Sequence, residues 1–251
     1  MLYLSNPPGV SSTVRRSTID AMNELNRLQL GALGDPAIAA HIENYELAFR
    51  MQTEMPTVQD LSGETKQTLA LYGLDDPVTE NFGRQCLMAR RFAEAGVRVI
   101  QVTHSDGKVQ WDQHGNLKAG HENNALAVDQ PIAGLLKDLK SRGLWDSTLV
   151  VWTSEFGRTS WGESGTGRDH NPWGYTQWLA GGGLKAGFTY GETDEVGLQV
   201  ADKDKAVDTY DLHATVLHLM GLDHLKTTFI HNGRSERPTV VYGKVIKEIL
   251  A

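Results

Sequence analysis

Apolar side chains recur at spacings of three and four through most of the first 96 residues, which is the pattern of amphipathic helices. Four helices are predicted there, over residues 18–30, 35–49, 62–72 and 81–95. The second begins at Asp35, because an aspartate followed by Pro36 is a typical N-cap and first-turn pair. Residues 1–96 are therefore predicted to be a mainly helical segment, an insertion or cap of the same domain as the rest of the chain.

The pattern changes after this segment. Residues 97–103 and 147–153 are short β-branched runs with the character of buried strands, and a strong helical pattern over residues 125–142 lies between them. A helix between two strands is the βαβ unit, in which the two strands are parallel. Residues 97–251 are therefore predicted to form an α/β core with a mainly parallel sheet. The remaining predicted elements are a strand over residues 175–180 and helices over residues 209–220 and 241–250.

Acidic, basic and imidazole side chains gather where the first two predicted strands end. The loop after the first strand holds His104, Asp106, Asp112, His114 and His121. The loop after the second strand holds Glu155, Arg158, Arg168, Asp169 and His170. In an open α/β sheet, ligands bind beyond the carboxyl ends of the strands, so these groups are expected to converge.

Carboxylates together with neutral imidazoles are suitable ligands for zinc, manganese or another divalent ion. Asp112 and His114 are two residues apart, so they project to the same side of an extended loop. Asp169 and His170 are adjacent, and a turn can present one of them as a ligand and the other as the group that orients it. The sequence therefore predicts a divalent-metal site, although each histidine taken alone also suits a surface or hydrogen-bonded role.

Composition excludes several classes of partner. The formal net charge is -7 and the pI is about 5.7, which argues against a broad surface for nucleic acid or anionic membranes. No run of about 18 apolar residues is present, so no membrane-spanning helix is predicted.

The single cysteine, Cys86, is predicted to be a small buried residue of a helix. The glycine-rich stretch at residues 162–167 lacks the Gly-Lys-Ser/Thr ending of a phosphate loop.

Several short motifs follow one another between residues 111 and 215. They are Trp-Asp-Gln-His-Gly-Asn at residues 111–116, Thr-Ser-Glu-Phe-Gly-Arg-Thr at 153–159, Gly-Arg-Asp-His at 167–170, Ala-Gly-Gly-Gly-Leu-Lys-Ala-Gly at 180–187, Gly-Glu-Thr-Asp-Glu at 191–195 and Asp-Leu-His-Ala-Thr at 211–215. The series resembles the bacterial family catalogued as domain of unknown function 1501. That family looks like a branch of the alkaline phosphatase and sulfatase superfamily, and the resemblance covers about residues 2–251.

The resemblance implies an alkaline phosphatase-like sandwich and metal-dependent hydrolysis of phosphate or sulfate esters. It implies that zinc, manganese or calcium is held by Asp112, His114, Glu155 and His170, with Glu155 at a second metal position. Arg158, Arg168 and Asp169 are then the candidate catalytic residues. A small-molecule or glycan ester is the implied substrate, and a periplasmic or secreted location is implied for the protein.

Three departures from the superfamily pattern keep an alternative open. Asp112 and His114 are closer in sequence than the aspartate and histidine of the superfamily's first metal site. Phe156 stands where the superfamily has a metal-binding histidine. The strand that carries the nucleophile is expected to precede Met1, because nothing before residue 97 resembles it. The alternative is a catalytically degenerate module that binds a glycan or a protein partner. The structural alternative for Arg158 and Arg168 is a salt bridge that holds the loop of Glu155.

Overall fold

The computed structural model describes residues 5–105, 111–162 and 164–251. Asp106, one of the polar residues of the first predicted loop, lies outside the described residues. The chain divides into two compact units. The first unit comprises Met1–Leu69 and Arg91–Ile100, and the second comprises Ala70–Arg90 and Gln101–Ala251.

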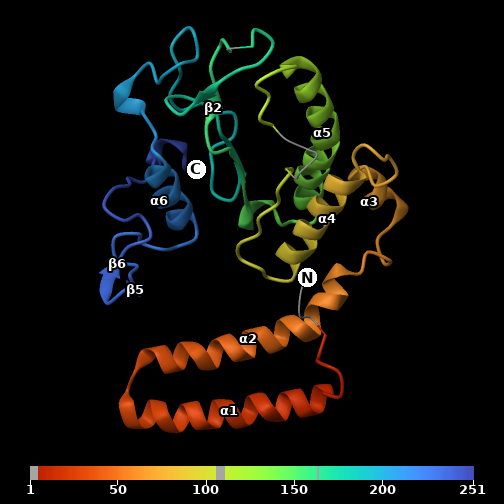
Figure 1. The fold of residues 1–251 in the computed structure, drawn as a ribbon, viewed down its shortest axis with the longest axis vertical. Coiled ribbons are helices and arrows are strands. Elements are labelled where there is room, and N and C mark those ends of the chain that lie inside the picture. Colours follow the sequence, from red (N-terminus) through yellow and green to blue (C-terminus); the bar gives the residue numbers. More distant parts are fainter. Residues whose placement is uncertain (1–4, 106–110, 163) are drawn as a thin grey trace. The chain divides into compact units, whose positions relative to one another are not determined.

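The first unit contains a helical hairpin of α1 (Ser12–Leu33) and α2 (Pro36–Gln59), which lie side by side (Figure 1). As predicted, the Asp35 side chain caps α2 by accepting a hydrogen bond from the Ala37 amide. Polar groups also join the two helices, because Glu46 on α2 accepts hydrogen bonds from the guanidinium of Arg16 and the side-chain amide of Asn23 on α1. These bonds fix how the two helices are aligned along their length.

Helices with buried side chains form much of the second unit. Its main helices are the first part of α4 (Glu80–Glu94), α5 (Leu117–Ser141) and α6 (Thr209–Leu219). Tyr72, Leu87 and Leu139 are almost completely buried and form part of its core. A short helix, α3 (Lys66–Leu71), precedes Tyr72, and single-turn 3₁₀ helices occur at Trp145–Ser147, Lys203–Lys205 and Lys247–Ile249.

The strands of the second unit pair only in twos among the described residues. The pairs are β1 (Leu149–Trp152) with β4 (Trp178–Gly181), β2 (Gly157–Arg158) with β3 (His170–Asn171), and β5 (Phe229–His231) with β6 (Arg234–Glu236). All three pairs are antiparallel.

The predicted α/β sandwich with a mainly parallel sheet is therefore wrong. Helices account for 46% of the described residues and strands for only 9%, and no parallel pair occurs among them. Residues 97–103 form no strand, and Val99 is 75% exposed. A β-branched run becomes a strand only where another backbone satisfies its N–H and C=O groups, and in this structure the partner of β1 is β4.

Most local predictions are confirmed. The four helical patterns of the first segment correspond to α1–α4, and the patterns at residues 125–142 and 209–220 belong to α5 and α6. The run at residues 147–153 contains β1, and the run at residues 175–180 overlaps β4. The predicted helix over residues 241–250 is wrong, since only a 3₁₀ turn forms there. The backbone of this segment forms hydrogen bonds to α6 instead. The Lys244 amide donates to the Asp211 carboxylate, and the Ile246 amide donates to the Thr215 hydroxyl.

Three helices are long enough to cross a bilayer, since α1, α2 and α5 contain 22, 24 and 25 residues. Each carries charged side chains along its length. Within the described ranges, no helix combines the length and the apolarity that a membrane span requires, in agreement with the prediction from the sequence.

Cys86 lies on the buried face of α4, as predicted. Desolvation raises the pKa of its thiol to about 12. The sulfur is therefore protonated at neutral pH and behaves as a small apolar group rather than as a nucleophile.

Candidate metal centre

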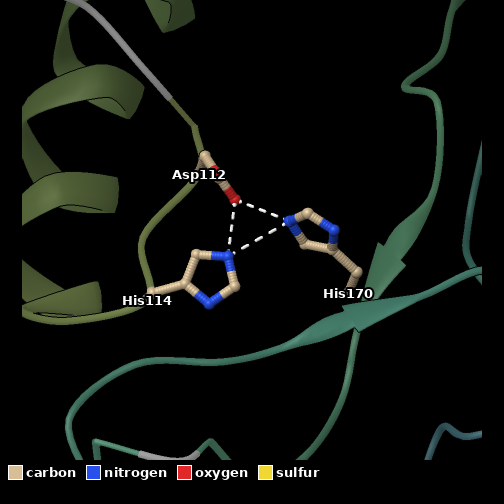
Figure 2. A group of neighbouring side chains, drawn as sticks. All are labelled: Asp112, His114 and His170. Atoms are coloured by element: carbon tan, nitrogen blue, oxygen red, sulfur yellow. Dashed lines mark hydrogen bonds and ion pairs between the residues drawn. The ribbon is translucent and has the colours of Figure 1, made fainter.

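Three side chains converge on one point at the surface of the second unit, as Figure 2 shows. Asp112 Oδ1 lies 2.8 Å from His170 Nε2 and 3.1 Å from His114 Nε2, and the two Nε2 atoms are 3.2 Å apart. The three side chains are 50%, 52% and 45% exposed, in the order Asp112, His114 and His170. Two imidazole nitrogens and a carboxylate oxygen thus form a nearly equilateral triangle that is open to solvent.

The loop that carries Asp112 and His114 is held by backbone hydrogen bonds to the loop before His170. The Arg168 amide donates to the Gln113 carbonyl at 3.1 Å, and the Leu117 amide donates to the Thr166 carbonyl at 2.9 Å. These bonds join residues that are 55 and 49 positions apart in the sequence. Asp112 and His114 are consequently fixed opposite the end of the Gly162–Arg168 loop, where the chain enters β3.

The short β2–β3 ladder places two more side chains of the site on one face. Arg158 on β2 and His170 on β3 are directly opposite each other in the register of this pair. Side chains opposite each other in an antiparallel ladder lie on the same face of the sheet. Both side chains accordingly reach the same Asp112 oxygen, with Arg158 Nη2 at 2.7 Å from it.

The Asp112 carboxylate is held in its charged form. Hydrogen bonds from His170 and from Arg158 lower its pKa from 3.8 to about 2. A carboxylate with this pKa remains ionised at any physiological pH, and an ionised carboxylate is the form that binds a metal.

Asp169 lies behind His114. Asp169 Oδ1 is 3.5 Å from His114 Nδ1, while the Nε2 atom of the same ring faces Asp112 and His170. A carboxylate on the Nδ1 side favours the tautomer that carries its proton on Nδ1 and leaves the Nε2 lone pair free for a metal. The arrangement matches the role of an orienting carboxylate.

Replacing Asp169 with asparagine is expected to weaken divalent-metal binding about tenfold. The substitution removes the negative charge near His114 Nδ1 and so weakens the preference for the metal-binding tautomer. The expected loss is at the lower end of such effects, because the contact is 3.5 Å long. Isothermal titration calorimetry with zinc measures this loss of affinity. The matched control is Asp129→Asn, because Asp129 is an exposed residue of α5. Equal affinities in Asp169→Asn and the parent chain would contradict this role.

Phe156 supports the third ligand. Its ring centroid lies 4.1 Å from that of His170, with 33° between the ring planes. The Arg158 guanidinium lies 5.5 Å from the centre of the same phenyl ring. Phe156, which stands where the superfamily has a metal-binding histidine, therefore packs against the imidazole of His170. Phe156 and Arg158 are two residues apart along an extended segment, and that spacing is the sequence signal for a shared face.

The structure brings together three of the four candidate metal ligands. Glu155 is not part of the metal-capable group found among the described residues, and its carboxylate accepts a hydrogen bond from the neighbouring Ser154 hydroxyl. Neither arginine pairs with Glu155 among the described residues, and Arg158 forms its ion pair with Asp112 instead. Arg168 donates to the Gly167 carbonyl at 2.7 Å.

The dimensions of the triangle suit a metal ion. At metal–ligand bonds of about 2.1 Å, two ligands at right angles lie about 3.0 Å apart, and two ligands at the tetrahedral angle about 3.4 Å. The observed separations of 2.8, 3.1 and 3.2 Å are close to the first value. An ion bound by one face of three ligands retains open positions for water or a substrate.

Comparisons with known proteins place the chain in a family. The family model described as Protein of unknown function (DUF1501) matches residues 1–250. No curated protein and no solved structure matches the chain. Because the family model covers nearly the whole sequence, the chain belongs to the DUF1501 family.

Proposed function

We propose that this chain provides the metal centre of a hydrolase that acts on phosphate or sulfate esters. The observation that carries the proposal is the triangle of Asp112, His114 and His170, whose spacing suits one divalent ion. Two imidazole ligands favour zinc or manganese over calcium, which prefers a shell of oxygen ligands. The expectation that this family is a branch of the alkaline phosphatase and sulfatase superfamily supports the assignment of the reaction class.

A divalent ion at such a site supplies a Lewis acid that polarises an ester oxygen or activates a bound water. The residues of this chain hold and orient it. Asp112 offers an ionised carboxylate. The Nε2 atoms of His114 and His170 would offer lone pairs once a metal displaces the proton that His170 donates to Asp112. Arg158 keeps the carboxylate in place through its 2.7 Å contact with Oδ1.

Charge at the site favours an anionic substrate. The charged side chains whose contacts place them there are Asp112, Arg158 and Asp169. Two carboxylates and one guanidinium give a formal charge of -1, so a divalent ion would leave the site positive. Arg168 pairs with no carboxylate within the described residues, and its remaining N–H groups are available as donors to ester oxygens. A phosphate or sulfate group is the chemistry that such a site would recognise.

A second candidate function is a module that binds a glycan or protein through the same surface without hydrolysing it. Two observations favour it: Phe156 occupies the place of a second-metal ligand, and Glu155 lies outside the metal-capable group. The resemblance also supports an exported protein in either case, with a periplasmic or secreted location as the proposal.

Hydrolysis of p-nitrophenyl phosphate or p-nitrophenyl sulfate by the protein as it is naturally produced, assayed with added zinc or manganese, tests the proposed activity. We expect one of the two esters to be cleaved, and the cleavage to stop when the metal is removed with a chelator. Arg168→Gln is expected to raise KM about tenfold, since it removes a charged donor to the anionic group. A chain that binds metal but cleaves neither ester would favour the binding module.

A further inference from the structure

Trp111, the residue before Asp112, is held at its indole nitrogen. Its Nε1–H donates to the backbone carbonyl of His104 at 2.9 Å, with His104 Nδ1 at 3.2 Å from the same nitrogen. Trp111 and His104 are seven residues apart in the sequence, and the bond holds the Trp111 side chain beside the His104 backbone. The backbone at residue 111 is thereby restrained on one side.

Aromatic rings restrain Trp111 further. The indole meets the His104 ring edge-to-face at 5.8 Å between centroids, and it meets the His121 ring of α5 at 5.6 Å. His104 in turn packs edge-to-face against Phe82 of α4 at 5.0 Å. Phe82 is buried, so the row of four rings connects Trp111 to the core of the second unit.

The backbone of Trp111 and the carboxylate of Asp112 share one partner. Arg158 Nη2 lies 3.4 Å from the Trp111 carbonyl and 2.7 Å from Asp112 Oδ1. Arg158 comes from the β2–β3 ladder, which also carries His170. A shift of Trp111 would therefore move Asp112 relative to both Arg158 and His170.

We propose that Trp111 is a positioning residue of the metal centre, which holds the Asp112 carboxylate at the distance from His114 and His170 that a divalent ion requires. The inference rests on the proposed function, because it presupposes that these three residues bind a metal. Trp111 acts through the backbone of Asp112 and contacts neither the ion nor the substrate. Its N–H bond to His104 and its ring contacts with His104 and His121 are the interactions responsible.

Cobalt(II) titration of the full chain, followed by visible absorption, tests the inference. Trp111→Phe keeps an aromatic ring but removes the N–H donor, and it is expected to weaken cobalt binding about tenfold. At saturating cobalt, the absorption bands of this variant are expected to shift, since they report the ligand geometry and not the stability of the fold. Trp173→Phe is the matched control, because Trp173 is 73% exposed, and it is expected to behave like the parent.

Circular dichroism of the metal-free variants checks that they are folded. If Trp111→Phe does not fold, His121→Leu replaces it, since this change removes a ring that packs against Trp111, and the same loss of affinity is expected. The inference about Trp111 alone would be overturned if the folded variant had the cobalt affinity and the spectrum of the parent chain. In the same experiment, His170→Ala must abolish cobalt binding. A parent chain that binds no cobalt would overturn the proposed function together with it.

Discussion

Replacing Asp138 with alanine is expected to destabilise the second unit by about 3–5 kcal/mol, the typical cost of breaking a buried ion pair. Asp138 Oδ2 lies 3.0 Å from Arg90 Nε and accepts a hydrogen bond from the Tyr72 hydroxyl at 3.0 Å. All three residues are buried, so alanine would remove a negative charge that faces the Arg90 guanidinium in the core. Urea denaturation followed by circular dichroism measures the loss.

Two variants show whether the charge is responsible. Tyr72→Phe removes one hydrogen bond to Asp138 but keeps the ion pair, and it is expected to cost only about 1 kcal/mol. Asp129→Ala, at an exposed position of the same helix, is expected to change the free energy of unfolding by less than about 0.5 kcal/mol. A loss in Asp138→Ala no larger than that in Tyr72→Phe would show that the buried ion pair contributes little.

Removing the Asp112 carboxylate is expected to reduce the affinity for zinc more than about 100-fold, because removal of a ligand costs more than the loss of a group that orients one. Asp112 Oδ1 is the atom on which both imidazoles converge, and the remaining pair of histidines would hold an ion only weakly. Isothermal titration of Asp112→Ala against the parent chain measures the loss.

Glu155→Ala is the matched control for that prediction. Glu155 is also an acidic residue of the predicted metal site, but the structure leaves it outside the group of converging ligands. Its removal is therefore expected to leave zinc affinity nearly unchanged. If Glu155→Ala lost the metal and Asp112→Ala kept it, the ligand set described here would be incorrect.

The helices of this protein could be predicted from the sequence because their signals are local. The apolar spacing of α1, the Asp35-Pro36 pair before α2 and the apolar positions of α5 each depend on residues within a few turns of one another. The sheet could not be predicted in this way. Residues 149–152 read as a strand, but nothing within them specifies that their partner is antiparallel β4.

The terminal segment illustrates the same limit. Residues 241–250 have a helical apolar pattern, yet the backbone there is bonded to Asp211 and Thr215 of α6 instead of to itself. Those bonds span more than 30 residues of sequence. Tertiary partners of this kind override local preference, and they are invisible to a periodicity argument.

The composition of the candidate site was easier to predict than its geometry. Residue chemistry and spacing indicated the pairs Asp112 with His114 and Asp169 with His170, and the family resemblance then implied a ligand set that also included Glu155. Their meeting depends on the β2–β3 register and on the bond between the Arg168 amide and the Gln113 carbonyl, which join residues far apart in the sequence. For the same reason, the packing of Phe156 against His170 could not be inferred from the motif.

The most direct test of the metal centre is the stoichiometry of bound zinc, measured by elemental analysis after equilibrium dialysis of the parent chain and of His170→Ala. The triangle of Asp112, His114 and His170 predicts about one ion per parent chain and almost none in the variant, because a third of the ligand set is lost. A folded parent chain without zinc, or a His170→Ala chain that retains the full amount, would contradict the assignment of this site.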